Sequence, residues 1–289
     1  MFIFWGYPTD GSNKCVEGTA STFDDCVTDC QGSTTCMLAY GTEDSCMLCD
    51  VFTVSTIAQS DKEDGVKTAI KVDDPTDGCP SDMESEGYTR TNGATGYNLT
   101  FAGGVWKVSY GKQCLDDTWL MVDRPNGTQC IKVFSQSTPI GRYDAGWYCN
   151  ETFNASLIGM QTVAELNYIL KMAKQQVGSV PQYEYSGIWI NGGRKGTCKT
   201  TTTGACAGIL AFDYFGFYQS SFAAYTFAPG FPTIALDNSV EPNCLELLMS
   251  QSQTANNGMI KNAGCTNACT ADGTVCGLSW VCGMSPTTV

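Results

Sequence analysis

Seventeen cysteines and no histidine constrain this 289-residue chain more than any other feature. In a reducing compartment so many thiols would need a metal or redox role, and without histidine every zinc site would consist of cysteine alone. The one C-x-x-C pair, Cys46 and Cys49, has no second pair to complete a four-thiolate site. We therefore interpret the cysteines as a disulfide framework. The lack of histidine also excludes Ser-His-Asp and Cys-His catalysis.

Four N-glycosylation sequons point to the secretory route, and they begin at Asn98, Asn126, Asn150 and Asn154. The apolar start of the chain, residues 1–5, is too short for a signal peptide and lacks a basic region. We expect that a signal peptide was removed before residue 1, or that the start is otherwise trimmed. The sequence thus predicts a secreted, extracellular glycoprotein.

Charge and composition exclude two classes of partner. The chain has 16 Lys and Arg against 29 Asp and Glu, which gives a net charge of −13, whereas nucleic-acid backbones need clustered cations. No run approaches the ~18 apolar residues of a membrane span. Apolar residues make up 43% of the chain, which is typical of a chain that buries a core. We predict no cofactor and no resident metal. We also predict no enzymatic activity, because no spaced acid pair stands in a convincing pocket context.

Residues 1–73 are predicted to form a small helix-on-sheet unit. A helix is expected to begin near residue 22, with Cys26 and Cys30 on one side of it because they are four residues apart. Strands are predicted close behind it and towards residue 72. The unit has six cysteines, enough for three bridges: Cys15, Cys26, Cys30, Cys36, Cys46 and Cys49.

This unit resembles the PAN/apple-type module of nematode secreted proteins. The resemblance covers residues 1–73 and rests on the Trp-Gly start at 2–8, the spacing from Phe23 through Cys26 and Cys30 to Cys36, and the pair at 71–72. Residues 73–78 are a turn-rich junction. Residues 74–113 are predicted to be a strand-rich bridging segment, with a hairpin or two strands over 100–110, and no role is assigned to it.

The third region, residues 114–289, carries several local patterns. Cys114 and Cys130 flank a predicted hairpin. Thr162 and Glu165 form a predicted capping box, and apolar residues then recur at helical spacing up to residue 177. A short buried strand is predicted over 187–192.

These residues resemble a C-type lectin-like domain of the type abundant in nematodes. The matching motifs are Cys114 to Cys130, 145–149, 157–165, 188–190, 194–198, 243–245, Cys265 and 282–283. The resemblance implies an α+β fold overall: a disulfide-stapled PAN-like module followed by a long-form lectin-like domain with two helices, antiparallel sheets and a long loop.

The resemblance also implies disulfide pairs. It pairs Cys114 with Cys130, Cys149 with Cys282, and Cys244 with Cys265, with local bridges for Cys198–Cys206 and Cys269–Cys276. Cys276 could exchange roles with Cys282, and we prefer Cys282 because residues 280–281 are expected to form the closing strand. On this count Cys79 is left over. It either forms an intermolecular disulfide or indicates that the pairing scheme is wrong.

Sugar binding in this family usually uses one calcium ion. The ligands come from Glu/Gln-Pro-Asn/Asp in the long loop, from an acid near the third cysteine and from Trp-Asn-Asp before the fourth. This chain contains Glu241, Pro242 and Asn243, but they abut Cys244. The family spacing instead falls on residues 227–233, where the proline is kept and both flanking ligands are missing.

The Trp-Asn-Asp position is occupied by Ile260, Lys261 and Asn262. Lys261 is expected to put an ammonium group where a cation would sit, and Asn262 is left as an oxygen ligand. Calcium prefers sites with several carboxylates. We therefore predict that calcium is not bound in the usual sugar site.

Aromatic residues crowd the long loop between residues 212 and 231. The family also has aromatic residues at positions matching Phe212, Tyr214 and Phe227, which are expected to be core. Four others exceed the family pattern and are either loop core or a platform for a ligand: Phe215, Phe217, Tyr218 and Phe222. Arg194 and Lys195 could meet an acidic ligand, but we interpret them as a solvated turn.

We predict an extracellular recognition protein that binds a glycan or an extracellular protein ligand. The alternative is a disulfide-linked structural or matrix component that assembles through the PAN-like module, the aromatic loop or Cys79. Dimers that survive boiling but are cleaved by reductant would favour this alternative.

Overall fold

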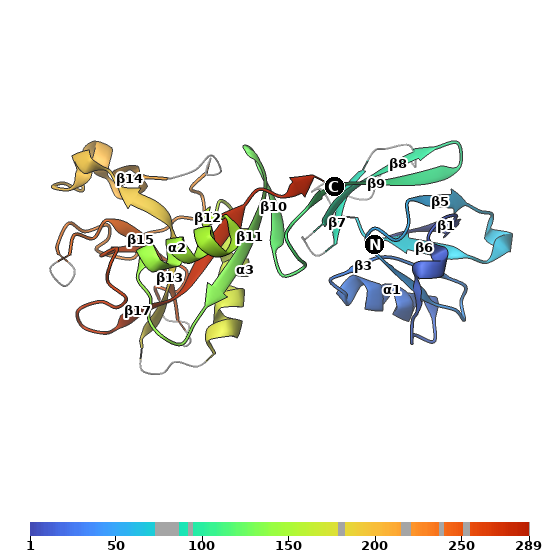
Figure 1. Ribbon diagram of the computed structural model, residues 1–289, viewed down its shortest axis with the longest axis horizontal. Coiled ribbons are helices and arrows are strands. Elements are labelled where there is room, and N and C mark those ends of the chain that lie inside the picture. The colour runs from blue at the N-terminus through green and yellow to red at the C-terminus, as the bar shows by residue number, and fades with distance from the viewer. Residues whose placement is uncertain are drawn as a thin grey trace. The chain divides into compact units, whose positions relative to one another are not determined.

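The computed structural model describes residues 1–72, 87–91, 95–178, 183–214, 221–236, 240–250 and 255–288, with backbone only for 87–91. The chain divides into two compact units (Figure 1). Unit 1 comprises Met1–Met121 and Pro286–Val289, and unit 2 comprises Val122–Ser285.

Unit 1 is built on one sheet with the strand order β2-β4-β3-β6-β1-β5-β9-β8-β7, and β18 pairs with β9. The pairings in this sheet are antiparallel. The strands are β1 (Phe2–Pro8), β2 (Val16–Glu17), β3 (Cys36–Gly41), β4 (Met47–Asp50), β5 (Thr56–Gln59), β6 (Lys67–Ile70), β7 (Gly87–Thr91), β8 (Thr95–Ala102), β9 (Val105–Gln113) and β18 (Thr287–Thr288). Two 3-10 turns, η1 (Ser12–Lys14) and η2 (Lys62–Asp64), connect strands.

One helix, α1 (Phe23–Gly32), lies against β3 and β4 (Figure 1). The Thr22 hydroxyl caps it by accepting a hydrogen bond from the Asp25 N–H at 3.2 Å. Its buried face consists of Phe23, Cys26 and Cys30, which recur at helical spacing. Disulfides join Cys26 to Cys46 and Cys30 to Cys36, and a third bridge joins Cys15 to Cys49. The predicted α+β unit with a stapled helix is confirmed.

Strands from the segment 74–113 belong to this sheet. β8 and β9 form the hairpin predicted there, and β9 continues the sheet by pairing with β5. Tyr97, Leu99 and Trp106 from these strands are buried in the same core cluster as Phe4 and Ile57. The segment therefore supplies part of the apolar core of unit 1.

Lys71 is a buried cation at the end of this core, with 7% of its surface exposed. Its Nζ donates to the Ser33 carbonyl at 2.6 Å. Burial lowers the pKa of Lys71 to about 8, and the nearby Asp50 offsets part of this shift. Because a lysine in the unfolded chain titrates near 10.5, the unfolded state binds more protons between these two values.

Unit 1 is therefore expected to become more stable as the pH rises from about 8 to about 10.5. The gain is expected to be roughly 1–2 kcal/mol, because each pKa unit corresponds to about 1.4 kcal/mol and solvent screening removes part of it. Urea unfolding of Lys71→Met across this pH range should show a flatter profile than the parent. Lys14→Met, at an exposed lysine, is the control and should keep the parent's slope. Equal slopes for the parent and Lys71→Met would contradict this assignment.

Unit 2 is built on a second sheet with the strand order β10-β11-β17-β13-β15-β16. In addition, β12 pairs with β17, and β14 pairs with β13. β13 and β17 run parallel, and the other pairings described in register are antiparallel. The strands are β10 (Leu120–Arg124), β11 (Gly127–Ser135), β12 (Ser156–Leu157), β13 (Tyr185–Arg194), β14 (Phe212–Asp213), β15 (Cys244–Met249), β16 (Ile260–Ala263) and β17 (Val275–Met284). Three short 3-10 turns are η3 (Gly196–Cys198), η4 (Gly204–Cys206) and η5 (Gly208–Ala211).

Two helices pack on this sheet, α2 (Arg142–Phe153) on β12 and β17 and α3 (Val163–Val177) on β11 (Figure 1). The Thr162 hydroxyl caps α3 by accepting from the Glu165 N–H at 3.1 Å. The Glu165 carboxylate binds the Gln161 N–H and Arg124. The hydroxyl half of the predicted capping box is therefore present, while the carboxylate has another partner. No helix among the described residues is both long and apolar enough to cross a membrane.

Candidate ligand-binding site

Disulfides fix the framework of unit 2. The structure joins Cys149 to Cys282, Cys244 to Cys265, Cys198 to Cys206 and Cys269 to Cys276, which are the pairs that the resemblance implies. Cys114 and Cys130 are each disulfide-bonded. Cys79 lies outside the described residues. The bridge from Cys149 fastens α2 to β17, and that from Cys244 fastens the end of the long loop.

The four sequon asparagines are all exposed. Asn98 lies on β8 and Asn126 in the turn between β10 and β11. Asn150 lies in the last turn of α2, and Asn154 is the left-handed residue that ends this helix. Each acceptor is thus at the surface of its unit.

Arg194, the last residue of β13, is buried in the base of the long loop with 9% of its surface exposed. Its Nη2 donates to the Thr233 carbonyl at 2.6 Å, its Nη1 to the Cys198 carbonyl at 3.1 Å and its Nε to the Pro242 carbonyl at 3.4 Å. The guanidinium lies 5.0 Å from the centre of the Phe212 ring. Burial lowers the pKa of Arg194, but a guanidinium stays charged in proteins. The interpretation of Arg194 as part of a solvated turn is therefore wrong.

Asn262 on β16 completes this cluster from the opposite side. Its Oδ1 accepts from the Thr233 N–H at 2.9 Å, and its Nδ2 donates to the carbonyls of Thr233 at 2.8 Å and Pro242 at 2.7 Å. Each of these two carbonyls thus accepts from both Arg194 and Asn262. We call Arg194, Asn262, Thr233 and Pro242 the guanidinium cluster. The Phe231–Pro232 peptide bond just before Thr233 is cis.

The aromatic residues of the long loop pack on one another. Phe222 lies 4.4 Å from Tyr214 and 5.4 Å from Tyr225 between ring centres, and Phe212 stacks on Phe227 at 6.0 Å. Phe222 is half-buried in these contacts, which favours a core role for it. The other three candidate platform residues, Phe215, Phe217 and Tyr218, lie outside the described residues.

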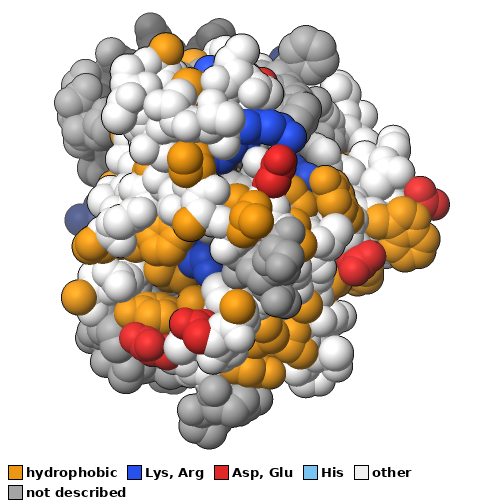
Figure 2. Space-filling model, turned by 90° about the vertical axis from the view of Figure 1, so that its left-hand side faces the viewer, with side chains coloured by type: hydrophobic (Ala, Val, Ile, Leu, Met, Phe, Trp, Pro, Cys, Tyr) orange, Lys and Arg blue, Asp and Glu red, His pale blue; other side chains and the backbone are white. Residues whose placement is uncertain are grey.

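Exposed apolar side chains that sequence reasoning did not single out lie on the same loop. Leu210 is 56% exposed, Ile234 42% and Leu236 63%. Ile234 directly follows Thr233 of the guanidinium cluster. Figure 2 shows hydrophobic side chains in several separate groups on one face of the molecule, with charged side chains of both signs scattered among them. A ligand that contacts this loop would meet aliphatic groups.

Two family models match the chain. A model described as C-type lectin domain-containing protein 141/158 matches residues 123–285, more than half of the chain. The chain belongs to this C-type lectin family. A second model, a PAN-like domain, matches residues 1–72. No match is found among curated proteins.

Several solved structures also resemble the chain. A calcium-independent type II antifreeze protein is 14% identical over 61% of this chain and 97% of its own, with a TM-score of 0.37. The carbohydrate-recognition domain of cow CD23, determined with a GlcNAc2Man3 oligosaccharide, is 16% identical over 61% and 98%, with a TM-score of 0.38. That of mouse scavenger receptor C-type lectin is 14% identical over 61% and 99%, with a TM-score of 0.35. The family assignment rests on the family model.

In the long loop of this C-type lectin domain, the oxygens of the guanidinium cluster are already engaged in hydrogen bonds. The Thr233 and Pro242 carbonyls each accept two hydrogen bonds, so both lone pairs of each oxygen are in use. Both the Oδ1 and the Nδ2 of Asn262 already form hydrogen bonds. Among the residues that the structure describes, no group of three carboxylate, thiol or imidazole side chains could hold a metal. The guanidinium cluster thus contains a side-chain cation and no carboxylate.

The ammonium group of Lys261 does not lie where the sequence predicts it, beside Asn262 in the long loop. Its Nζ lies 3.6 Å from Glu246 Oε2, and both side chains are buried. Glu246 and Lys261 are cross-strand neighbours on β15 and β16, and successive residues of a strand point to opposite faces. The ammonium group therefore lies away from Asn262, and the cation among the loop carbonyls is Arg194.

Glu241 and Asn243 of this lectin domain are paired with neighbours. Glu241 Oε2 accepts from Lys199 Nζ at 2.7 Å and from Asn243 Nδ2 at 2.8 Å. Lys199, and secondarily Asn243, lower the pKa of the exposed Glu241 carboxyl. Glu241 of the Glu-Pro-Asn sequence thus forms a surface ion pair with Lys199.

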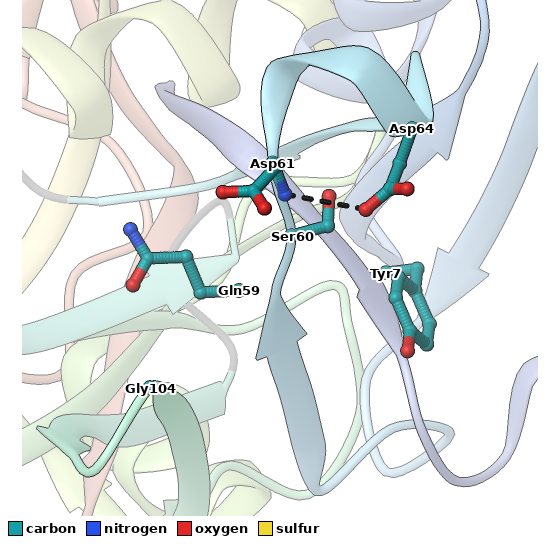
Figure 3. Close-up of a pocket in the computed structure, with 6 residues that line it drawn as sticks. All are labelled: Tyr7, Gln59, Ser60, Asp61, Asp64 and Gly104. Atoms are coloured by element: carbon teal, nitrogen blue, oxygen red, sulfur yellow. Dashed lines mark hydrogen bonds between the residues drawn. The ribbon is translucent and has the colours of Figure 1, made fainter.

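A shallow hollow of about 360 Å³ lies in unit 1 (Figure 3). It is lined by Tyr7, Gln59, Ser60, Asp61, Asp64 and Gly104. Asp64 Oδ2 accepts from the Asp61 N–H at 3.2 Å, and the two carboxylates form the capping box of η2. These acids therefore have a structural role.

Proposed function

We propose that this chain is a secreted recognition protein whose C-type lectin domain binds a carbohydrate or an extracellular protein without calcium in the usual sugar site. C-type lectin-like domains bind carbohydrates or proteins, and the fold is typically a binding domain and not an enzyme. Seven described disulfides and four exposed sequons support an extracellular location.

The main support for this proposal comes from the hydrogen bonds of the guanidinium cluster. They support a loop held by a side-chain cation, because Arg194 binds three carbonyls that come from three separate segments of the loop. Such a loop needs no metal to keep its shape. The exposed aliphatic residues Ile234 and Leu236 come shortly after Thr233 in the sequence, and we assign them to the ligand surface.

Ligand binding is expected to be equal with calcium and with a chelator. The test is binding of the oxidised full chain to a broad panel of glycans and extracellular proteins under both conditions. Arg194→Met should weaken binding and destabilise unit 2 by about 2–3 kcal/mol, because it leaves buried carbonyls with fewer donors. Lys195→Met is the matched control at the next residue, where the side chain is 36% exposed, and it should behave like the parent.

Chelator-sensitive binding would refute calcium independence and return Glu241 and Asn243 to the candidate ligands. Calcium-insensitive binding that survives Arg194→Met unchanged would place the ligand away from the long loop. Absence of any binding on both panels would contradict the recognition function.

A further inference from the structure

Helix α2 has an inner face that is fixed to the sheet of unit 2. Ala145 and Cys149 are buried, and Cys149 is bonded to Cys282. Tyr148 packs edge-on against Phe134 at 5.3 Å and Trp280 at 5.1 Å between ring centres. These contacts determine which residues of the helix face solvent.

The solvent side carries an unusual set of side chains. Tyr143, Trp147 and Asn150 follow one another at intervals of four and three residues, which places them on one stripe of the helix. We call these three residues the outer stripe of α2. Trp147 is 67% exposed and Tyr143 59%, and Trp147 has the largest exposed fraction among the large hydrophobic side chains that the structure describes. Tryptophan is usually far more buried, so this ring is expected to have an occupant.

The stripe itself contains a glycan acceptor beside this ring. Asn150 begins the sequon Asn150-Glu-Thr152, and both Asn150 and Thr152 are exposed. Residues three apart on a helix have Cβ atoms roughly 5–6 Å apart, so Asn150 and Trp147 are surface neighbours. Helical Cα–Cβ bonds tilt towards the N-terminus, which directs a group on Asn150 back towards the turn that carries Trp147.

The local hydrogen bonding is compatible with a sugar on this amide. Asn150 Nδ2 donates to Glu151 Oε1 at 3.1 Å. A glycosylated amide keeps one N–H, so it can retain this bond while its other position bears the sugar. The C–H groups on one face of a pyranose ring carry partial positive charge, and the face of an indole ring carries negative charge. The two surfaces are therefore complementary in both shape and charge.

We propose that Asn150 carries an N-linked glycan and that its first N-acetylglucosamine packs on the Trp147 ring. In the modification, the Asn150 amide nitrogen attacks C1 of the sugar of a lipid-linked oligosaccharide diphosphate. The C1–N bond forms, the C1–O bond to the diphosphate breaks, and the amide proton is lost as the lipid diphosphate leaves. The outer stripe of α2 is then covered by the chain's own glycan. The inference rests on the secretory route proposed above.

The first test is occupancy, measured by glycopeptide mass spectrometry of the full chain secreted from eukaryotic cells. We expect Asn150 to be glycosylated. An unmodified Asn150 beside occupied sequons elsewhere would overturn this inference alone. Four unmodified sequons would overturn the secretory route as well.

The second test is the contact itself. The isotope-labelled glycan is trimmed enzymatically to one N-acetylglucosamine, and its proton shifts are measured by NMR. Stacking on indole should move the sugar protons upfield, and Trp147→Ala should abolish this shift. Tyr143→Ala, one turn further from Asn150 on the same stripe, is the matched control and should leave it unchanged. Sugar protons at the same frequencies in the parent and in Trp147→Ala would overturn the proposed packing.

A stability measurement gives an independent readout. Asn150→Gln should lower the Tm of unit 2 by a few degrees in the parent and by much less in the Trp147→Ala background. Asn126→Gln removes an acceptor in the β10–β11 turn, and its effect should be the same in both backgrounds. Equal effects of Asn150→Gln in both backgrounds would contradict coupling between the glycan and Trp147.

Discussion

Replacement of Glu165 by alanine is expected to destabilise unit 2 by about 3–5 kcal/mol, because it would leave a buried arginine without its counter-ion. Arg124 and Glu165 are 1% and 4% exposed, and Arg124 Nη2 lies 2.7 Å from Glu165 Oε2. A second bond runs from Arg124 Nε to Glu165 Oε1 at 3.3 Å. The Gln161 N–H also donates to this carboxylate at 2.8 Å. The pair thus connects β10 with the first turn of α3.

The effect is measured by chemical and thermal unfolding of the full chain. A loss of this size corresponds to a fall in Tm of roughly 10 °C for a unit of this size. Glu151→Ala, at an exposed acid on α2, is the matched control and should change stability by less than about 0.5 kcal/mol.

A double variant separates the charge from the packing. Arg124→Met with Glu165→Met removes both charges, and the loss should be clearly smaller than for Glu165→Ala alone, because buried ion pairs are often replaceable by apolar pairs. A double variant that is as unstable as the single one would show that the hydrogen bonds to the backbone, and not the unpaired charge, dominate.

Removal of the Cys149–Cys282 disulfide is expected to be the other large effect, up to about 5 kcal/mol in Cys149→Ala with Cys282→Ala. The bridge spans 133 residues, and the conformational entropy that a disulfide removes from the unfolded chain grows with the length of the loop. Other bridges inside this loop reduce the gain. We expect loss of the cooperative unfolding transition of unit 2 at 37 °C.

The matched control is removal of the Cys269–Cys276 bridge, which spans only 7 residues. Its loss should cost about 2 kcal/mol on the same chain-entropy argument. Both double variants are compared by denaturant unfolding under non-reducing conditions. Equal losses would contradict the dependence on loop length and point to lost packing around Cys149 instead.

The sequence was a good guide where a feature depends on neighbouring residues. The Thr162 cap is an example, because the hydroxyl and the N–H that it binds are three residues apart. The β8–β9 hairpin can also be predicted from the sequence, since alternating side chains flank a Gly-Gly pair at 103–104. Both glycines have positive φ in the turn that joins the two strands. The fold class followed from the family resemblance and the cysteine spacing.

The guanidinium cluster could not be predicted from the sequence. Arg194 binds the carbonyls of Cys198, Thr233 and Pro242, and any residue type can supply a carbonyl. The sequence therefore does not reveal which carbonyls Arg194 binds, and a solvated turn is the natural interpretation of Arg194 from the sequence alone. The same reason explains Lys261, whose position depends on a cross-strand register with Glu246 that becomes visible only in the folded sheet.

The identity of the cation at the base of the long loop affects how this protein can be regulated. A bound metal has an occupancy that depends on its concentration, and carboxylate ligands lose their charge in acid. Arg194 is covalently part of the chain, its local concentration never changes, and a guanidinium does not titrate in the physiological range. A loop held in this way should keep its shape in calcium-poor or acidic fluids, so release of a ligand would have to depend on some other signal.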